Sequence, residues 1–241
     1  MIIFIFSKSS WNVYNFRKNL IKKLISDKHD IFVIAKKDKN EKKLQNLGCK
    51  FIDINFENDS FNILKDLMAL IKIFLLIKNF KPDLFLNFNI KPVILGSIIC
   101  NFMNIKVVNT ITGLGNAFLG RLFLKKIATY LYKLAISDNN KVIFHNHEDK
   151  KIFIKEGISK KFNSFVVLGS GVDTNYFKFS KLLKKKTIFL FVGRLLWNKG
   201  IMKFIEASNI CEPIERRGIE GGLHIWEYPD YSRNYMITAD V

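Results

Sequence analysis

Short runs of apolar residues alternate with helical patterns along most of this chain, and this alternation limits the possible folds more than any other feature. The runs are rich in Ile, Val and Phe and show no polar face, as expected for strands buried on both sides. Such strands, each followed by a helix, predict an α/β fold with a parallel sheet covered on both faces. We expect strands at residues 2–6, 30–35, 50–54, 83–88, 106–110, 141–144 and 164–168. We expect helices at residues 15–26, 40–47, 62–79, 92–103, 121–136 and 147–156.

The same pattern predicts two domains, of which the second is incomplete. Residues 1–177 contain the strands and helices of the first domain, and the strongly basic residues 178–186 are typical of a linker. Residues 187–241 begin a second α/β domain, with a strand at 187–192 and a helix at 199–209. From about residue 211 the composition changes, because lysine disappears and arginine and aromatic residues take over. For this tail we expect no helix or strand that closes a core.

The charge is strongly positive. The chain has 39 Lys and Arg against 21 Asp and Glu, a formal net charge of +18. Such an excess favours a polyanionic partner, such as an anionic lipid surface or a phosphorylated substrate. A coding bias toward Lys, Ile, Phe and Asn explains the excess equally well. Nucleic acid is not the expected partner, because no motif of a nucleic-acid-binding fold accompanies the charge.

Three cysteines, no export signal and one long apolar stretch bear on the compartment. Cys49, Cys100 and Cys211 are far apart and lack metal-ligand or redox spacing, which favours a reducing compartment. The N-terminus has no basic segment before its short apolar run, so we expect no secretory signal. Residues 61–80 are apolar but contain four charged residues, whereas a spanning helix needs about 20 mostly apolar residues. We interpret them as a buried amphipathic helix, so that any membrane contact is peripheral.

Ligands of open parallel sheets bind beyond the carboxyl ends of the strands, so the loops there are the first places to search. The loop after the first strand combines hydroxyl, amide, aromatic and basic side chains. Its aromatic rings suit stacking on a sugar and its arginine suits a phosphate. Simple capping of the next helix is the structural alternative. The candidate residues of this loop are Ser10, Trp11, Tyr14, Asn15 and Arg17.

Two further loops carry candidate residues of the first domain. Asn89 and Lys91 precede a proline at an expected first helical turn, where they suit either a ligand or ordinary helix-start chemistry. After the fifth strand, Thr112 is followed by Gly113 and Gly115, whose small size lets a ligand approach the backbone. This glycine pair lacks the third glycine and the acidic residue of a dinucleotide-binding fingerprint, so a nicotinamide cofactor is not expected.

The loop after the first strand of the second domain is the most specific one. Gly193 ends the strand, and Arg194 and Lys199 lie five residues apart before a helix. Two cations beside a helix N-terminus suit a diphosphate. A turn with exposed basic residues is the structural alternative.

Other chemistries find little support in the sequence. His145 and His147 have no cysteine or third histidine at a zinc-ligand spacing, so we expect a polar loop there and no metal site. The hydrolase, phosphate-loop and metalloprotease motifs GxSxG, GxxxxGK[ST] and HExxH do not occur.

Taken together, these segments resemble glycosyltransferase family 4, whose members have two Rossmann-like domains in the GT-B arrangement. The likeness is greatest to bacterial N-acetylhexosaminyl transferases that act on polyprenyl-diphosphate-linked sugars, and it extends to about residue 210. It depends on residues 10–17 (SWNVYNFR), 90–92 (IKP), 109–115 (NTITGLG), 142–146 (VIFHN), 169–173 (GSGVD) and 191–200 (FVGRLLWNKG).

The resemblance implies transfer of an N-acetylhexosamine from a UDP-sugar, with retention and without a metal or cofactor. Arg194 and Lys199 match the pair that binds the donor diphosphate in the family. The first domain then binds the polyprenyl-diphosphate-linked acceptor. Its basic surface is expected to dock on an anionic membrane, where each nearby Lys or Arg adds about 1 kcal/mol. This implies a cytoplasmic protein on the inner face of the cell membrane, with the helices at 15–26 and 121–136 as docking candidates.

Two departures from the family pattern affect these expectations. Thr112 occupies the place of a histidine that many members carry after the fifth strand, so the role of that histidine does not transfer, and no catalytic residue is assigned. The family's second domain continues for well over 100 further residues, including a Glu-x7-Glu region that holds the donor. We therefore expect a truncated enzyme that is inactive alone. The alternative is a non-catalytic basic module that binds the membrane or the acceptor.

Overall fold

The computed structural model describes residues 1–56, 63–115, 118, 122–179, 188–193, 199–211, 223–227 and 235–240. The chain divides into two compact units, Met1–Phe177 and Lys178–Val241. Each unit is described by itself.

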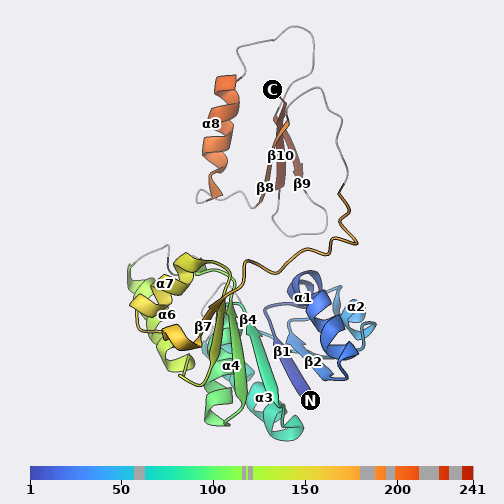
Figure 1. Cartoon of the computed structure of the whole chain (residues 1–241), viewed down its shortest axis with the longest axis vertical. Helices are drawn as coiled ribbons and strands as arrows, with labels where there is room; N and C mark the ends of the chain where they lie inside the picture. The colour runs from blue at the N-terminus through green and yellow to red at the C-terminus, as the bar shows by residue number, and fades with distance from the viewer. Residues whose placement is uncertain are drawn as a thin grey trace. The chain divides into compact units, whose positions relative to one another are not determined.

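The first unit contains a parallel sheet of seven strands in the order β3-β2-β1-β4-β5-β6-β7 (Figure 1). Every predicted strand of this unit is present, with ends within two residues of those expected. This confirms the α/β fold with a parallel, Rossmann-like sheet. The strands are β1 (Ile2–Phe6), β2 (Asp30–Ala35), β3 (Lys50–Asp53), β4 (Leu84–Phe88), β5 (Lys106–Ile111), β6 (Lys141–Phe144) and β7 (Ser164–Val166).

Alternate side chains of β1 enter two separate cores, because successive residues of a strand point to opposite faces. Phe4 and Phe6 pack with residues of the helices α3 and α4 on one face. Ile3 and Ile5 pack with residues of α1 and α2 on the other face. Figure 1 shows these helices around the sheet. The helices of this unit are α1 (Ser10–Ser26), α2 (Glu41–Gln45), α3 (Ile63–Phe80), α4 (Ile90–Phe102), α6 (Leu122–Ala135), α7 (His147–Lys155) and the 3-10 turn η1 (Lys161–Asn163).

Helix α1 begins five residues earlier than the sequence predicts. The side chain of Ser9 caps the helix by accepting a hydrogen bond from the Asn12 backbone N–H at 3.2 Å. A serine at this position satisfies one of the backbone donors that a helix start leaves unpaired. The expected loop of residues 7–17 is therefore only three residues long, and its candidate residues lie on the first two turns of α1.

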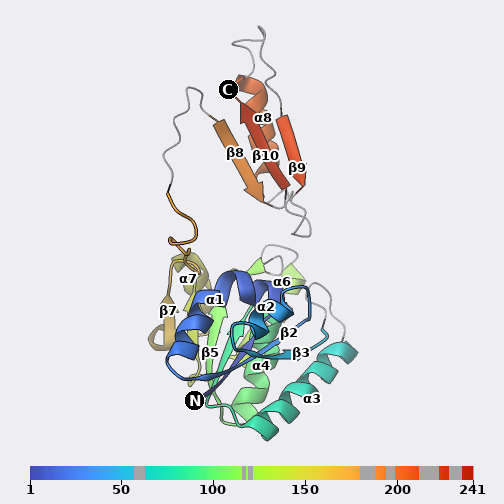
Figure 2. The same cartoon turned by 90° about the vertical axis from the view of Figure 1, so that its right-hand side faces the viewer.

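The interpretation of residues 61–80 as a buried helix is wrong for the part that the structure describes. Helix α3 buries only Ala69, Ile73 and Ile77. Figure 2 shows α3 along the outside of the first unit. A helix that is apolar around most of its circumference cannot bury all of it against a single layer. Its exposed large apolar side chains are Ile63, Leu64, Leu67, Met68, Ile71, Leu75 and Phe80.

The second unit contains the predicted strand and helix at its start, β8 (Ile188–Gly193) and α8 (Ile201–Cys211). The tail adds β9 (Leu223–Glu227) and β10 (Tyr235–Asp240), which the sequence did not predict. The three strands pair in the order β8-β10-β9, and β10 runs antiparallel to both neighbours. Too few residues separate β9 from β10 for the crossover that parallel neighbours require, so this pair can only be antiparallel. In this respect the unit differs from the parallel sheet of the first unit.

No helix within the described ranges combines the length and the hydropathy needed to span a membrane.

Candidate functional site

The strand order reverses between β1 and β4, and ligands of doubly wound sheets bind at such a point, beyond the carboxyl ends of the strands. Polar side chains from three segments meet there. The Ser7 hydroxyl lies 2.9 Å from Asn12 Oδ1 and 2.9 Å from Asn89 Oδ1. Both amide oxygens are acceptors, so the single hydroxyl hydrogen of Ser7 is directed to one of them at a time.

Asn89, a predicted site residue, has an unusual backbone. Its φ of 76° and ψ of 164° lie in a region that is occupied almost only by glycine. The side-chain oxygen also accepts a long hydrogen bond, 3.4 Å, from the Lys8 backbone N–H. Strain of this kind persists only where the surroundings enforce it, and it is concentrated at functional sites. Asn89 therefore joins the loops after β1 and β4 at the switch point.

The loop after β5 lies against the same region. Gly115 has a φ of 64°, and a Cβ placed on it would come within 2.9 Å of Ile90 Cδ1, at the start of α4. A side chain there would displace the end of the Ile90 side chain and would strain the backbone at this positive φ. Thr112 is exposed and Gly113 has open space beside it. The structure thus brings the predicted residues Asn89, Thr112, Gly113 and Gly115 to neighbouring loops.

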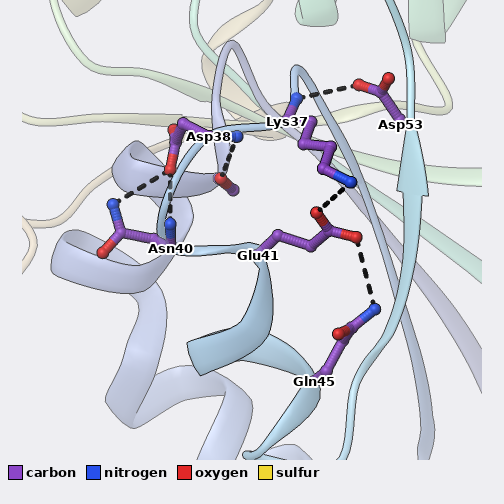
Figure 3. Close-up of polar contacts among 7 residues, drawn as sticks. Lys37, Asp38, Asn40, Glu41, Gln45 and Asp53 are labelled. Atoms are coloured by element: carbon purple, nitrogen blue, oxygen red, sulfur yellow. Dashed lines mark hydrogen bonds and ion pairs between the residues drawn. The ribbon is translucent and has the colours of Figure 1, made fainter.

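Ser10 and Trp11 take part in helix-start chemistry. Asp38, in the loop after β2, accepts a hydrogen bond from the Trp11 N–H at 2.7 Å, and its own N–H donates to Ser10 Oγ at 3.1 Å. Figure 3 shows Asp38 also bonded to Asn40. Burial raises the pKa of Asp38, but the hydrogen bonds from Ser10, Asn40 and Trp11 outweigh it, so the pKa lies below its usual value. These contacts hold α1 in place and agree with the structural alternative.

Tyr14 and Asn15 do not join the switch-point residues. The Tyr14 ring packs against the core beneath α1 and α2, with Lys18 and Lys43 each 5.4 Å from its centroid. Asn15 is exposed and donates to the Trp11 carbonyl at 2.9 Å. Neither contact suggests ligand binding.

Lys91 has an acidic partner. Its ammonium lies 2.8 Å from both carboxylate oxygens of Asp66 in α3, and both side chains are largely buried. The prediction that Lys91 contacts an acceptor stays a prediction, and the structure gives it a role in joining α4 to α3.

Arg17 is buried, with 7% of its surface exposed, and lies on α1 facing the carboxyl end of the sheet. Its guanidinium carbon lies 4.2 Å from the centroid of the Phe88 ring, at the end of β4. Its Nη1 donates to Ser170 Oγ at 2.8 Å, from the segment after β7. Burial lowers the pKa of Arg17 from 12.5 to about 10, so the side chain remains a cation at neutral pH.

His145 and Ser170 are the residues that the sequence did not assign to the site. His145 follows β6 and is half-buried. Burial and the nearby charge of Arg17 lower its pKa, while Asp149 acts in the opposite direction. Its position directly after β6 is a usable signal, and it belongs to the segment 142–146 that carries the family resemblance, although the sequence predicts only a polar loop there. Ser170 is separated from Arg17 by 153 residues, so no local pattern could have joined them.

In the second unit, Gly193 ends β8 and Lys199 lies two residues before α8, as the sequence predicts. The Phe191 and Phe204 rings, 5.8 Å apart, connect this strand to the helix. Arg194 lies outside the described residues, so its pairing with Lys199 stays a prediction.

The family model described as "Glycosyl transferase 4-like" matches residues 2–146, more than half of the chain and all within the first unit. A relative from Campylobacter jejuni is 27% identical over 90% of this chain and 62% of its own length. It is named N,N'-diacetylbacillosaminyl-diphospho-undecaprenol alpha-1,3-N-acetylgalactosaminyltransferase. A relative from Escherichia coli is 28% identical over 62% of this chain and 41% of its own length. It is named UDP-Gal:alpha-D-GlcNAc-diphosphoundecaprenol alpha-1,3-galactosyltransferase.

The chain thus spans less than two thirds of either relative. Among solved structures, Anabaena Alr3699/HepE in complex with UDP and glucose has a TM-score of 0.54 at 19% identity, over 75% of this chain and 47% of the other. UDP-GlcNAc 2-epimerase from Neisseria meningitidis has a TM-score of 0.52 at 12% identity, over 90% of this chain and 55% of the epimerase. These similarities confirm the fold, and the family match confirms the resemblance read from the sequence: the chain belongs to the glycosyl transferase 4-like family.

Proposed function

We propose that this chain is part of a glycosyltransferase that transfers a sugar from a UDP-sugar to a sugar carried on polyprenyl diphosphate. The observation that carries the proposal is the family match of the first unit, together with two relatives whose names both specify a diphosphoundecaprenol-linked sugar. An N-acetylhexosamine is the proposed donor sugar, as in the name of the C. jejuni relative. Both names specify an alpha linkage, which supports transfer with retention from an alpha-linked UDP-sugar.

The two units have different parts in this proposal. The first unit binds the acceptor at the switch point, where the loops after β1, β4 and β5 converge. The second unit binds the donor diphosphate through Lys199, two residues before α8, and through Arg194, which lies outside the described residues. No metal or cofactor is needed, because the two cations neutralise the diphosphate.

Docking on the inner face of the cell membrane fits the exposed apolar side chains of the first unit. They are most numerous on α3, where Ile63 is 84% exposed, and on α6, where Leu122 is 79% exposed. Both helices pack against α4, and both carry lysines among the apolar residues. Apolar side chains that enter the interface and lysines that pair with anionic headgroups together bind a bilayer surface. The predicted helix 121–136 remains a candidate, and α3 replaces α1 as its companion.

UDP binding tests the donor half of the proposal. We expect the 241-residue protein to bind UDP and Arg194→Ala to weaken that binding about tenfold or more, because hydrogen bonds to a charged phosphate are strong. Lys203→Ala, on an exposed position of α8, is the matched control and should leave the affinity unchanged. Isothermal titration calorimetry measures both.

The alternative is a non-catalytic module that binds only the membrane and the acceptor. The family model matches residues of the first unit alone, whereas the C. jejuni transferase aligns over 90% of the chain and favours the enzyme. Absence of any UDP affinity would support the module and contradict the donor proposal. Product formation from UDP-N-acetylgalactosamine and a short polyprenyl-diphosphate-linked sugar would establish the enzyme directly and overturn the expectation that the chain is inactive alone.

A further inference from the structure

Arg17 is a buried cation without a carboxylate partner. Among the residues that the structure describes, no acidic side chain forms an ion pair with it, whereas the half-buried Lys91 has Asp66. A charge taken out of water is costly unless it is paired, so a buried cation that persists without a counter-ion needs an explanation. The Phe88 ring beneath the guanidinium compensates for only part of the lost hydration.

The hydrogen bonds of Arg17 use one end of the guanidinium. Nη1 donates to Ser170 Oγ at 2.8 Å and makes a long contact of 3.4 Å with the Phe16 carbonyl. Nε is buried and has no partner, and no partner of Nη2 lies in the described part of the chain. Nε and Nη2 form the side-on fork of the guanidinium, which binds two oxygens of a carboxylate or phosphate in one plane. The donors that the protein leaves unpaired are thus the ones that suit an oxyanion.

The backbone on either side of Ser170, the hydrogen-bond partner of the guanidinium, has open space beside it. Gly169 and Gly171 flank Ser170 with φ values of 81° and 75°, and a Cβ on either would meet no atom within 4 Å. His145 supplies a further nitrogen donor: it follows Phe144, whose carbonyl accepts a hydrogen bond from the Val167 N–H at 2.8 Å, so the end of β6 lies beside the segment that leads to Ser170. Asp149, whose charge raises the pKa of His145, accepts one hydrogen bond from the Asn146 side chain at 3.0 Å, and its backbone N–H donates to Asn146 Oδ1 at 2.7 Å.

We infer that Arg17, with His145 and Ser170, forms a binding site for the diphosphate of the acceptor, on the face of the first unit between α1 and the segment after β7. This inference rests on the proposed function and names the part of the acceptor that the first unit recognises. A diphosphate is common to the acceptor and to the UDP-sugar. We assign the acceptor because the site lies wholly in the first unit, whereas the donor cations Arg194 and Lys199 belong to the second.

The test compares the wild-type protein with Arg17→Met, Arg17→Lys and the exposed control Lys22→Gln from the same helix. The probes are inorganic diphosphate, farnesyl diphosphate and UDP, with affinities measured by calorimetry. We expect each diphosphate probe to bind Lys22→Gln as tightly as it binds the wild type. Arg17→Met should weaken the binding of farnesyl diphosphate and of inorganic diphosphate about 10- to 100-fold, which is the range for loss of a charge-assisted hydrogen-bonded pair. Arg17→Lys keeps the charge but loses the fork, so it should weaken binding less.

Thermal unfolding separates a binding role from a structural one. If Arg17 serves the ligand, Arg17→Met without ligand should melt at the same temperature as the wild type or higher, and diphosphate should raise the melting temperature of the wild type only. The pKa of His145, followed by NMR, should also rise when diphosphate binds the wild type. Equal diphosphate affinity in the wild type and Arg17→Met, or a destabilised Arg17→Met with no effect of diphosphate on the wild type, would overturn the inference.

The outcomes for the two proposals differ. Loss of UDP affinity in Arg17→Met, with unchanged affinity for farnesyl diphosphate, would assign the site to the donor and contradict the inference alone. Diphosphate binding through Arg17 without any transfer or UDP binding would contradict the proposed enzyme and leave the site standing.

Discussion

At the scale of single residues, three side chains at the carboxyl edge of the sheet have environments that ordinary folding does not favour. Asn89 has a strained backbone, and Arg17 is a buried cation without an acidic partner among the described residues. The pKa of His145 is lowered by burial and by the charge of Arg17. Each feature costs stability, and costs of this kind are concentrated where a protein binds or reacts. The three residues follow or face the ends of β4 and β6, at the edge where doubly wound sheets bind ligands.

Asn89→Ala should lower the free energy of unfolding by about 1–3 kcal/mol, because alanine tolerates a φ of 76° poorly and removes the oxygen that contacts Ser7 and Lys8. Asn89→Gly relieves the strain and should cost less. Urea unfolding measures both. Asn104→Gly, at an exposed position with a φ of 56°, is the control and should not destabilise the protein. Equal losses for Asn89→Ala and Asn89→Gly would show that the strain is unimportant.

His145 should make the protein less stable in acid. The pKa of His145 in the folded protein lies below its unfolded value of about 6.5, so the unfolded chain binds a proton more readily. The stability that the protein has above pH 6.5 is therefore lost as the pH falls from about 6.5 through the folded pKa. His145→Gln removes this dependence, so its stability should decline less than that of the wild type between about pH 6.5 and 5. Urea midpoints measured across this range test the sign, and parallel curves for the two proteins would contradict it.

At the scale of elements, the first unit has helices of two kinds. Helix α4 is nearly all buried, from Pro92 to Cys100, and packs against both α3 and α6. Helices α3 and α6 are covered on one side and present large apolar side chains on the other. Large apolar side chains gathered on the exposed sides of helices mark a site of interaction with a partner or a membrane.

Glutamine at three exposed positions of α3, Leu64, Leu67 and Ile71, should weaken binding to vesicles that contain anionic lipid by about tenfold or more. Each large apolar side chain that enters the interface contributes up to about 1.5–3 kcal/mol when it is fully buried. Vesicle sedimentation measures the loss. Leu20→Gln, on the exposed side of α1, is the control and should bind as the wild type does. If the control weakens binding and the α3 variant does not, the docking surface is α1 instead.

At the scale of the whole molecule, the first unit has a complete sheet and three apolar clusters of its own. Within the described residues, all the members of these clusters belong to the first unit and precede residue 167. A unit with its own core can fold alone.

A fragment of residues 1–177 should therefore unfold in urea in one cooperative transition with a midpoint close to that of the full chain. Circular dichroism measures the transition, and full-length protein is the control. A fragment without a cooperative transition would show that the first unit needs the second.

The local pattern by itself determined the strands and helices of the first unit, since the two-residue and 3.6-residue periods depend only on neighbouring residues. It also led to Arg17 and Asn89 as candidates and to the family, through motifs within single loops. Long-range contacts decided the rest. Asp38 stabilises the start of α1, so residues expected in a loop are helical. Its hydrogen bonds give Ser10 and Trp11 structural roles.

The layers packed against an apolar helix decide which of its faces is exposed to solvent. The exposed side of α3 could therefore not be predicted from its composition. In the tail, the short connection between β9 and β10 made antiparallel pairing necessary, although no strand was expected there. The contact of Arg17 with Ser170 depends on the order of strands in the sheet, because that order brings segments more than 100 residues apart to one edge.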